Sequence, residues 1–166
     1  RLSRNGGMQG GSGKAVVMGM LVRGGQVRAT VIPDRKHNIT EKIVRELVEP
    51  GTEVHTDEFQ GYYNLKDGYV HKVINHLEGY VKDNVHTNGI ENFWSLLKRG
   101  LNGTYIAVEP FHLFRYVDEQ AFRYNNRATK DNRLTDADRF HLALSQIAGK
   151  RLTFAEVTGK VGETAF

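Results

Sequence analysis

The sequence predicts an α/β fold. In its first half, short apolar or alternating segments typical of β-strands are interspersed with segments whose apolar residues recur at helical spacing. The order is strand, strand, helix, strand, helix, strand, and the second half is then mostly helical. A length of 166 residues suits a single domain that buries a core of its own. Because cysteine is absent, disulfides, thiolate zinc sites and a cysteine nucleophile are excluded.

The first two strands are expected to form an antiparallel hairpin. Residues 15–22 are a short apolar run that suits a buried strand, although Gly19 interrupts it. Residues 26–32 alternate between apolar and polar side chains, which is typical of a strand with one buried face. Gly24-Gly25 supplies the turn between the two strands, and Pro33-Asp34 ends the second one.

A helix is expected after this hairpin, followed by a strand, a shorter helix and another strand. Asn38 is the predicted N-cap of the first helix, because Glu41 lies three residues on and completes a capping box. Pro50-Gly51 ends that helix. The next three elements are expected over residues 52–57 (strand, with Val54 and Thr56 on one face), 58–65 (short helix) and 69–75 (strand).

Four helices are predicted in the second half of the chain. Thr87 or Asn88 caps the first, which runs to about Arg99, and Gly100 is expected to stop it. The other three are expected to begin at Pro110, to run from Asp136 to Ala148, and to run from a capping box at Thr153 and Glu156 to a stop at Gly159.

Charge is distributed unevenly along the chain. The formal net charge of +4 divides into +6 over residues 1–36, −5 over residues 37–91 and +3 over residues 92–166. An acidic middle between basic flanks fits a polyanion-binding protein with an acidic pocket for metal. The alternative is chance variation among solvated surface charges, and on charge alone we prefer it.

No feature of the sequence predicts a membrane or secreted protein. The longest apolar run, residues 15–22, is too short to span a bilayer. Residues 1–13 are basic and glycine-rich, which predicts a flexible lead-in rather than a secretory signal. We therefore expect a cytoplasmic protein.

Asp57 is the first candidate functional residue. It lies at the end of a predicted strand, where α/β folds place ligand-binding and catalytic groups. Its neighbour Glu58 doubles the local negative charge. The alternative is that Asp57 only caps the helix that begins at Glu58.

The helix over residues 87–99 carries a second set of candidates. Asn88, Glu91, Ser95 and Lys98 fall on one face at helical spacing, opposite an apolar face. The Glu91 carboxylate lies two turns from the Lys98 ammonium, so this face could hold a metal at one end and a phosphate at the other. The alternative is an ordinary amphipathic helix with solvated charges.

Histidine is concentrated in the middle of the chain. Four histidines fall within 32 residues: His55, His71, His76 and His86. Their spacing does not match the close pairs that bind zinc, so phosphate contact or ordinary surface placement is the favoured interpretation.

Cations and aromatic residues are frequent in the C-terminal half. Cations can contact phosphates, and aromatic rings can stack on exposed bases. The alternative is that the rings are part of the core and the cations are solvated. The residues concerned are Lys98, Arg99, Tyr105, Arg115, Arg123, Tyr124, Arg127, Lys130 and Arg133.

Residues 86–100 read His-Thr-Asn-Gly-Ile-Glu-Asn-Phe-Trp-Ser-Leu-Leu-Lys-Arg-Gly. This segment resembles the signature of bacterial insertion-sequence transposases of the DDE superfamily, in the group that reads His-Thr-Asn-x-Ile-Glu-x-Phe-Trp-Ser-x-Leu-Lys-Arg. Supporting matches occur in order on both sides, among them Thr56-Asp57-Glu58, Val73-Ile-Asn-His76 and Phe122-Arg-Tyr-Asn-Asn-Arg127. The resemblance covers about residues 14–127.

The resemblance implies an RNase H-like fold, in which helices flank a mixed sheet over residues 14–127. The flexible lead-in over residues 1–13 precedes this domain, and a helical extension over residues 128–166 follows it. The resemblance also implies a site for two Mg²⁺ (or Mn²⁺) ions, held by clustered carboxylates, that cleaves and joins DNA strands. The expected partner is DNA, both insertion-sequence ends and target. The expected location is the bacterial cytoplasm, in association with the nucleoid.

Individual roles follow from the same resemblance. Asp57 matches the second catalytic acid, Glu91 best matches the third, and Lys98 matches a cation that contacts substrate phosphate. Because members of this group can use Asn as the third ligand, Asn88 is a rival or additional metal ligand. The expected DNA contacts are Lys98, Arg99, His76, Tyr105 and Arg127.

The chain departs from the family pattern at its beginning. The family's first catalytic Asp precedes a basic, glycine-rich loop. Here that loop is residues 4–13, and no acidic residue occurs before Asp34. We therefore expect an N-terminally truncated transposase that lacks its first strand and first acid and is inactive by itself. The alternative is a non-catalytic DNA-binding or inhibitory fragment. An active form is expected to be a homo-oligomer.

Overall fold

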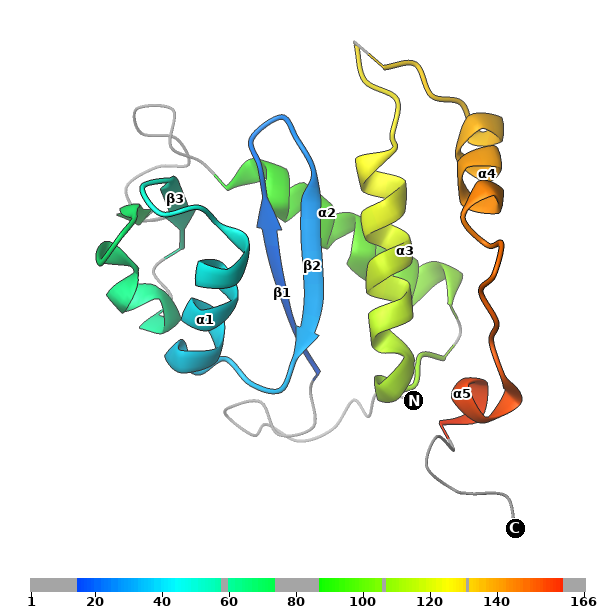
Figure 1. The fold of residues 1–166 in the computed structure, drawn as a ribbon, viewed down its shortest axis with the longest axis horizontal. Coiled ribbons are helices and arrows are strands. Elements are labelled where there is room, and N and C mark those ends of the chain that lie inside the picture. Colours follow the sequence, from blue (N-terminus) through cyan, green and yellow to red (C-terminus); the bar gives the residue numbers. More distant parts are fainter. Residues whose placement is uncertain (1–14, 58–59, 74–86, 106, 131, 160–166) are drawn as a thin grey trace. The chain divides into compact units, whose positions relative to one another are not determined.

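The computed structural model describes residues 15–57, 60–73, 87–105, 107–130 and 132–159 (Figure 1). The chain divides into two compact units, Arg1–Ala121 and Phe122–Phe166. The elements are β1 (Val16–Leu21), β2 (Val27–Ile32), α1 (His37–Leu47), β3 (Glu53–Thr56), the 3₁₀ helix η1 (Gln60–Lys66), β4 (Val70–Val73), α2 (Asn88–Arg99), the π-helical segment η2 (Gly100–Thr104), the 3₁₀ turn η3 (Pro110–His112), α3 (Leu113–Asn125), α4 (Asp136–Ser145) and α5 (Phe154–Thr158). The predicted α/β class is confirmed.

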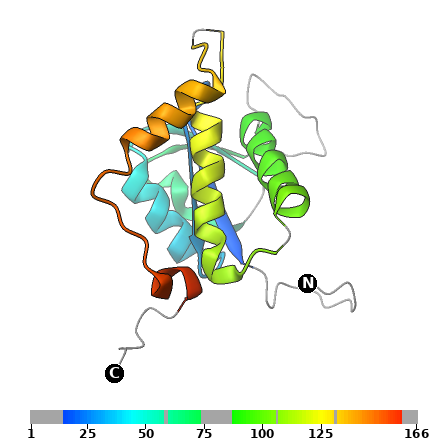
Figure 2. The ribbon, with the colours of Figure 1, turned by 90° about the vertical axis from the view of Figure 1, so that its right-hand side faces the viewer.

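β1 and β2 form the predicted antiparallel hairpin, with Val16 opposite Ile32 and Leu21 opposite Val27. Gly24 adopts a left-handed conformation (φ 69°) in the turn, which a side chain would disfavour. The two faces of β1 contact different helices, because side chains alternate along a strand. Figure 2 shows α1 and α2 on opposite sides of this hairpin.

The main core of the first unit lies on the α1 side of the hairpin. Met18 and Ile32 of the hairpin pack with Val44 of α1, and Leu65 and Tyr69 close the cluster. Each of these five side chains is at most 7% exposed. The hydroxyl of Tyr69 donates a hydrogen bond to the Val48 carbonyl (3.0 Å), which ties the start of β4 to the end of α1.

The start of α1 differs from the prediction. The helix begins at His37, its N-cap is Lys36, and no side chain caps it, so the expected role of Asn38 is wrong. The carboxylate of Asp34 accepts a hydrogen bond from the Lys36 amide (2.7 Å), and this turn brings the chain into the helix earlier than expected. Glu41 does not complete a capping box, since its carboxylate accepts from the Asn64 amide (3.2 Å).

β3 and β4 form a second sheet, and they are parallel. The predicted shared face of Val54 and Thr56 is confirmed, because Val54 packs on the core and Thr56 is buried. The helix between the strands is 3₁₀ over the residues described, and residues 58–59 and 74–75 of the predicted elements lie outside them. The described strands thus form two two-stranded sheets, so a single mixed sheet is not seen in this part of the chain.

α2 packs on the other face of β1 through two glycines. A Cβ on Gly19 would lie 2.6 Å from Cζ2 of Trp94, and a Cβ on Gly89 would lie 2.5 Å from Cδ2 of Leu21. The helix begins at Asn88 with Thr87 as its N-cap, as predicted. It ends at Arg99 with Gly100 as its C-cap, as predicted, but Gly100 keeps a right-handed helical conformation (φ −59°) and the chain continues into the π-helical segment η2.

The predicted helix at Pro110 begins as the turn η3 and continues as α3, which crosses from the first unit into the second. Within the second unit, α4 is capped by a box of Thr135 and Asp138 that was not predicted from the sequence, and it ends at Ser145 rather than Ala148. The capping box at the start of α5 is confirmed, and Gly159 ends this helix in a left-handed conformation. None of the helices in the described ranges is long and apolar enough to cross a membrane.

Candidate functional site

Asp57 lies directly after β3, as predicted, and it is exposed. The residue before it, Thr56, is buried, and its hydroxyl lies 2.8 Å from the Asp57 carbonyl oxygen and 2.8 Å from Nε2 of His71. Burial raises the pKa of the Tyr62 hydroxyl, and the negative charge of nearby Asp57 adds to this rise. The backbone around Asp57 is therefore held by β4 and by a buried side chain. The alternative that Asp57 caps a helix at Glu58 concerns a residue outside those described.

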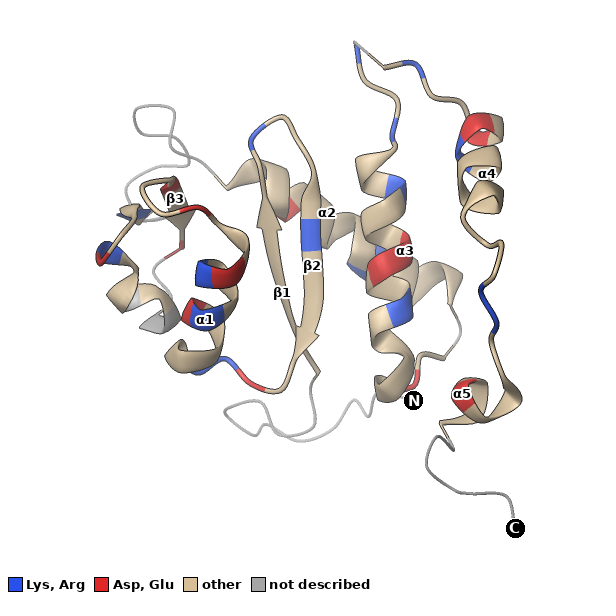
Figure 3. Cartoon of the chain, in the orientation of Figure 1, with Lys and Arg blue, Asp and Glu red and all other residues tan. Residues whose placement is uncertain are grey.

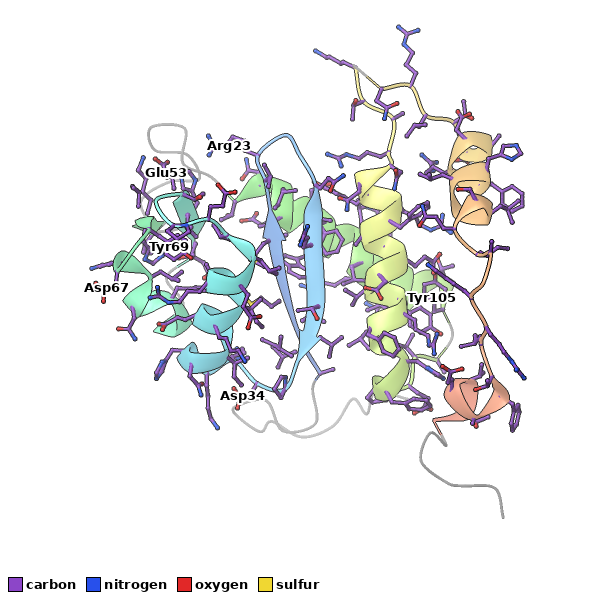
Figure 4. All side chains as sticks on the ribbon, viewed as in Figure 1. Arg23, Asp34, Glu53, Asp67, Tyr69 and Tyr105 are labelled. Atoms are coloured by element: carbon purple, nitrogen blue, oxygen red, sulfur yellow. The ribbon has the colours of Figure 1, made fainter. Side chains whose placement is uncertain are left out.

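The exposed face of β3 carries a polar network. The Glu53 carboxylate is 2.5 Å from Nε2 of His55 and 2.9 Å from the Lys72 ammonium. The pKa of Glu53 is lowered, first by the hydrogen bond from His55 and then by the one from Lys72. On its other side, Nδ1 of His55 is 3.2 Å from Nη2 of Arg23, in the turn between β1 and β2. Arg23 and Glu53 lie at the same end of the first unit (Figure 4).

α2 is amphipathic, as predicted. Phe93 and Leu97 are buried, whereas Asn88, Glu91 and Lys98 are exposed. Glu91 lies in the first turn, and its carboxylate accepts a hydrogen bond from the Thr87 hydroxyl (2.5 Å). The glycine contacts with β1 fix the apolar face of the helix, so its polar face is held outward. This geometry suits the site interpretation and the alternative of a solvated face equally.

The donor chemistry of these residues suits a hard cation. Carboxylate oxygens of Asp57 and Glu91 and an amide oxygen of Asn88 are the ligands that Mg²⁺ prefers in proteins. However, no three His, Asp or Glu side chains come together as a metal-binding group within the described residues. The described part of the chain therefore supplies candidate ligands without a complete metal site.

The histidines do not form a zinc site among the residues described. His55 pairs with Lys72 on the exposed face of the sheet, whereas His71 pairs with Val54 on the inner face. Burial lowers the pKa of His71, and the charge of Lys66 lowers it further. Nδ1 of His71 is buried and has no hydrogen-bond partner among the residues that the structure describes. The other two, His76 and His86, lie outside the described residues, as does the predicted DNA contact of His76.

The predicted DNA contacts lie in different environments. Lys98 and Arg99 are exposed in the last turn of α2. Tyr105 follows η2; its hydroxyl donates to the Glu119 carboxylate (2.6 Å), and its ring packs edge-on against another tyrosine. In the second unit, the Arg127 guanidinium lies 3.9 Å from the centroid of a tyrosine ring. Lys98 and Arg99 are thus more open to a partner than Tyr105 and Arg127, whose groups pack within the fold.

Surface charge on the first unit is mixed in sign. Basic and acidic residues both occur along α1, and the turn between β1 and β2 is basic (Figure 3). Sequence reasoning missed Arg23, which belongs to this turn. A cation beside two glycines carries no signal of its own, because its partner His55 lies 32 residues further along the chain.

Comparison with known proteins identifies the class of the molecule as transposase. Residues 1–125 match the family model of the ISXO2-like transposase domain, and the chain belongs to this family. A relative in Haemophilus influenzae, named an uncharacterized transposase-like protein, is 32% identical over 106 residues, which cover 63% of this chain and 85% of the relative. The resemblance to insertion-sequence transposases seen in residues 86–100 is confirmed, and the family supports a function in transposition.

Proposed function

We propose that this protein acts in DNA transposition by metal-dependent cleavage and transfer of DNA strands. Membership of the ISXO2-like transposase domain family supports a function in transposition. The observation that carries the chemistry is the placement of two carboxylates at the ends of ordered elements, Asp57 after β3 and Glu91 in the first turn of α2. At such an end, a side chain can point outward while its backbone stays in a fixed position. Catalysis by precisely positioned groups requires a backbone of this kind.

We propose an RNase H-like arrangement for the first unit. An antiparallel hairpin, a helix and a parallel strand pair follow one another in the order that the resemblance implies. In that arrangement the two described strand pairs belong to one mixed sheet.

Asp57 and Glu91 are the proposed ligands of Mg²⁺ or Mn²⁺, with Asn88 as a rival or additional ligand to Glu91. A bound pair of such ions supplies an activated oxygen nucleophile and stabilises the leaving oxygen. The protein's own contribution is to hold these side chains: Thr56 and His71 fix the backbone of Asp57, and the contact of α2 with β1 fixes that of Glu91.

DNA is the proposed partner, and an assembled form is proposed to be a homo-oligomer. Lys98 and Arg99 lie two turns beyond Glu91 on the same helix, so a strand bound at the carboxylates would place a phosphate near these cations. Tyr105 and Arg127 are further proposed contacts. The inward contacts of these two side chains favour a supporting role for them.

A nicking assay tests the catalytic proposal. The substrate is DNA that carries insertion-sequence ends, with Mg²⁺ or Mn²⁺, and the protein is the product of the complete natural reading frame. Asp57→Asn should lower the nicking rate by more than the roughly 10- to 100-fold typical of losing an outer-shell partner of a metal. Glu46→Gln, which removes an exposed carboxylate of α1, is the matched control and should nick normally. Nicking by Asp57→Asn at the normal rate would refute the assignment.

A second candidate is a non-catalytic DNA-binding or inhibitory transposase fragment. It is favoured by the lack of a group of three His, Asp or Glu side chains that could hold a metal in the described part of the chain. The 166-residue chain would then shift DNA in a gel at low salt without nicking it. Robust nicking by this chain alone, lost in Asp57→Asn, would exclude this candidate.

A further inference from the structure

The turn between β1 and β2 carries an arginine that reaches the second sheet. Nη2 of Arg23 lies 3.2 Å from Nδ1 of His55, on the exposed face of β3. His55 is two residues before Asp57, which corresponds to about 7 Å of extended strand. Arg23 therefore places a positive charge at the end of the strand that carries the proposed catalytic carboxylate.

The chemistry of this contact fixes the state of the histidine. A guanidinium group has only donors, so Nδ1 of His55 must accept the hydrogen bond from Arg23. Nε2 of the same ring donates to the Glu53 carboxylate (2.5 Å), which can only accept. The Lys72 ammonium contacts the same carboxylate oxygen (2.9 Å). The Glu53 carboxylate is thus in contact with His55 and Lys72 and not with Arg23.

The Arg23 guanidinium has a hydrogen-bond partner in His55 but no ion-pair partner among the described residues. Across the described ranges, no carboxylate lies within ion-pair distance of its guanidinium. The residue is exposed, and apart from the chain neighbours of Gly24 no heavy atom of the described residues lies within 4 Å of the position a Cβ on Gly24 would take. An arginine fixed by one ring nitrogen keeps most of its donors, and it loses less side-chain freedom when it binds an anion.

We propose that Arg23, positioned by His55, binds a phosphate of the DNA strand at the Asp57 end of β3. This inference rests on the proposed function, because it assumes that DNA is the ligand. The planar guanidinium matches two phosphate oxygens, and a charged hydrogen bond of this kind is about twice as strong as a neutral one. The site adds a phosphate contact from the hairpin turn to those expected from α2.

The test is DNA affinity as a function of salt concentration. Each lost phosphate contact lowers the slope of log K against log salt by about 0.9 for duplex DNA or about 0.7 for single strands. Arg23→Ala should weaken binding and reduce the slope by this amount. Arg23→Lys, which keeps the charge but not the planar fork, should weaken binding with little change in slope. Lys42→Ala removes another exposed cation, paired with Glu46 at 3.8 Å, and should leave both quantities unchanged.

A third variant separates binding from positioning. His55→Ala should weaken DNA binding less than Arg23→Ala and should keep the normal slope, because the guanidinium charge remains. If His55→Ala binds like the unaltered protein, His55 does not position Arg23 and that part of the proposal is wrong. Circular dichroism spectra establish that each variant is folded.

Two results would overturn the inference in distinguishable ways. If the unaltered protein binds DNA and Arg23→Ala has the same affinity and slope, the Arg23 site is wrong while the proposed function stands. If the unaltered protein binds no DNA at low salt, the proposed function fails together with this site.

Discussion

The two regions that carry the candidate ligands are held by different forces. α2, with Glu91, lies on β1 through apolar contacts in which Gly19 and Gly89 leave no room for a side chain. The end of β3, with Asp57, is held by hydrogen bonds of Thr56 and His71 and by a charged network on its exposed face. Adding volume to a close-packed contact lowers the free energy of unfolding considerably, whereas removing one exposed polar contact changes it little. The position of Glu91 should therefore be more sensitive to substitution of its supports than that of Asp57.

The largest effect on stability is expected for Gly19→Ala. The new Cβ would lie 2.6 Å from Cζ2 of Trp94 and 3.3 Å from a side-chain carbon of Ile90, and an indole ring cannot move aside cheaply. Overpacking of this kind lowers the free energy of unfolding by about 1–3 kcal/mol. Urea denaturation measures this change.

Gly103→Ala is the matched control for that substitution. Apart from its chain neighbours and the backbone of its own helix, no heavy atom of the described residues lies within 4 Å of the position that the new Cβ would take, and the φ of Gly103 is not in the left-handed region. The free energy of unfolding should stay constant or rise by up to about 1 kcal/mol, because alanine favours helical conformations. Equal stability of the two variants would show that the contact between α2 and β1 is loose.

A smaller effect is expected for Thr56→Val at the end of β3. The substitution keeps the shape of the buried side chain but leaves Nε2 of His71 without its partner, beside an Nδ1 that already lacks one. The cost should be about 1–2 kcal/mol in the free energy of unfolding. Thr30→Val, at an exposed position on β2, is the control and should change stability by less than about 0.5 kcal/mol. A Thr56→Val protein as stable as the control would show that this hydrogen bond does not hold the strand end.

The burial of His71 predicts a dependence of stability on pH. Since burial and Lys66 lower the pKa of His71 in the folded protein, the unfolded chain takes up this proton more readily. The ordinary pKa of histidine is about 6.5, and above that pH the stability contributed by neutral His71 is fully present. This stability is lost as the pH falls through the lower pKa that His71 has in the folded protein. His71→Gln should lose less stability than the unaltered protein between about pH 7 and pH 5. Parallel pH profiles would contradict this assignment.

The smallest effect is expected for Lys72→Ala on the exposed face of β3. The ammonium and the Glu53 carboxylate are both nearly half exposed, so solvent and salt screen their attraction. The melting temperature should stay constant within experimental error. A clear drop at low salt that disappears at high salt would show that the charged network holds this sheet more strongly than we infer.

Local signals predicted much of the fold. The hairpin, α2 and the capping box of α5 follow from patterns within a few residues, and the structure confirms all three. Asn38 was assigned wrongly as an N-cap. It has the residue type of a helix start, but the hydrogen bond from the Lys36 amide to the Asp34 carboxylate accompanies an earlier start of the helix, at His37.

The candidate site could be predicted only in part. The sequence predicts the places of Asp57 and Glu91 on their elements, because strand and helix ends leave local signals. It does not predict the contact between Arg23 and His55, because the two residues are far apart in the sequence and neither segment carries a pattern that indicates the contact. Nor does periodicity reveal the close contact of Gly19 with Trp94, which depends on how a helix and a strand pack.

The most direct test of the central claim compares cleavage and binding in the same variants. Asp57→Asn and Glu91→Gln are made in the product of the complete natural reading frame, and nicking and affinity are measured on DNA with insertion-sequence ends in Mg²⁺. The proposed function predicts that both variants lose nicking while they still bind the DNA. Nicking that persists in both variants at the normal rate would contradict it.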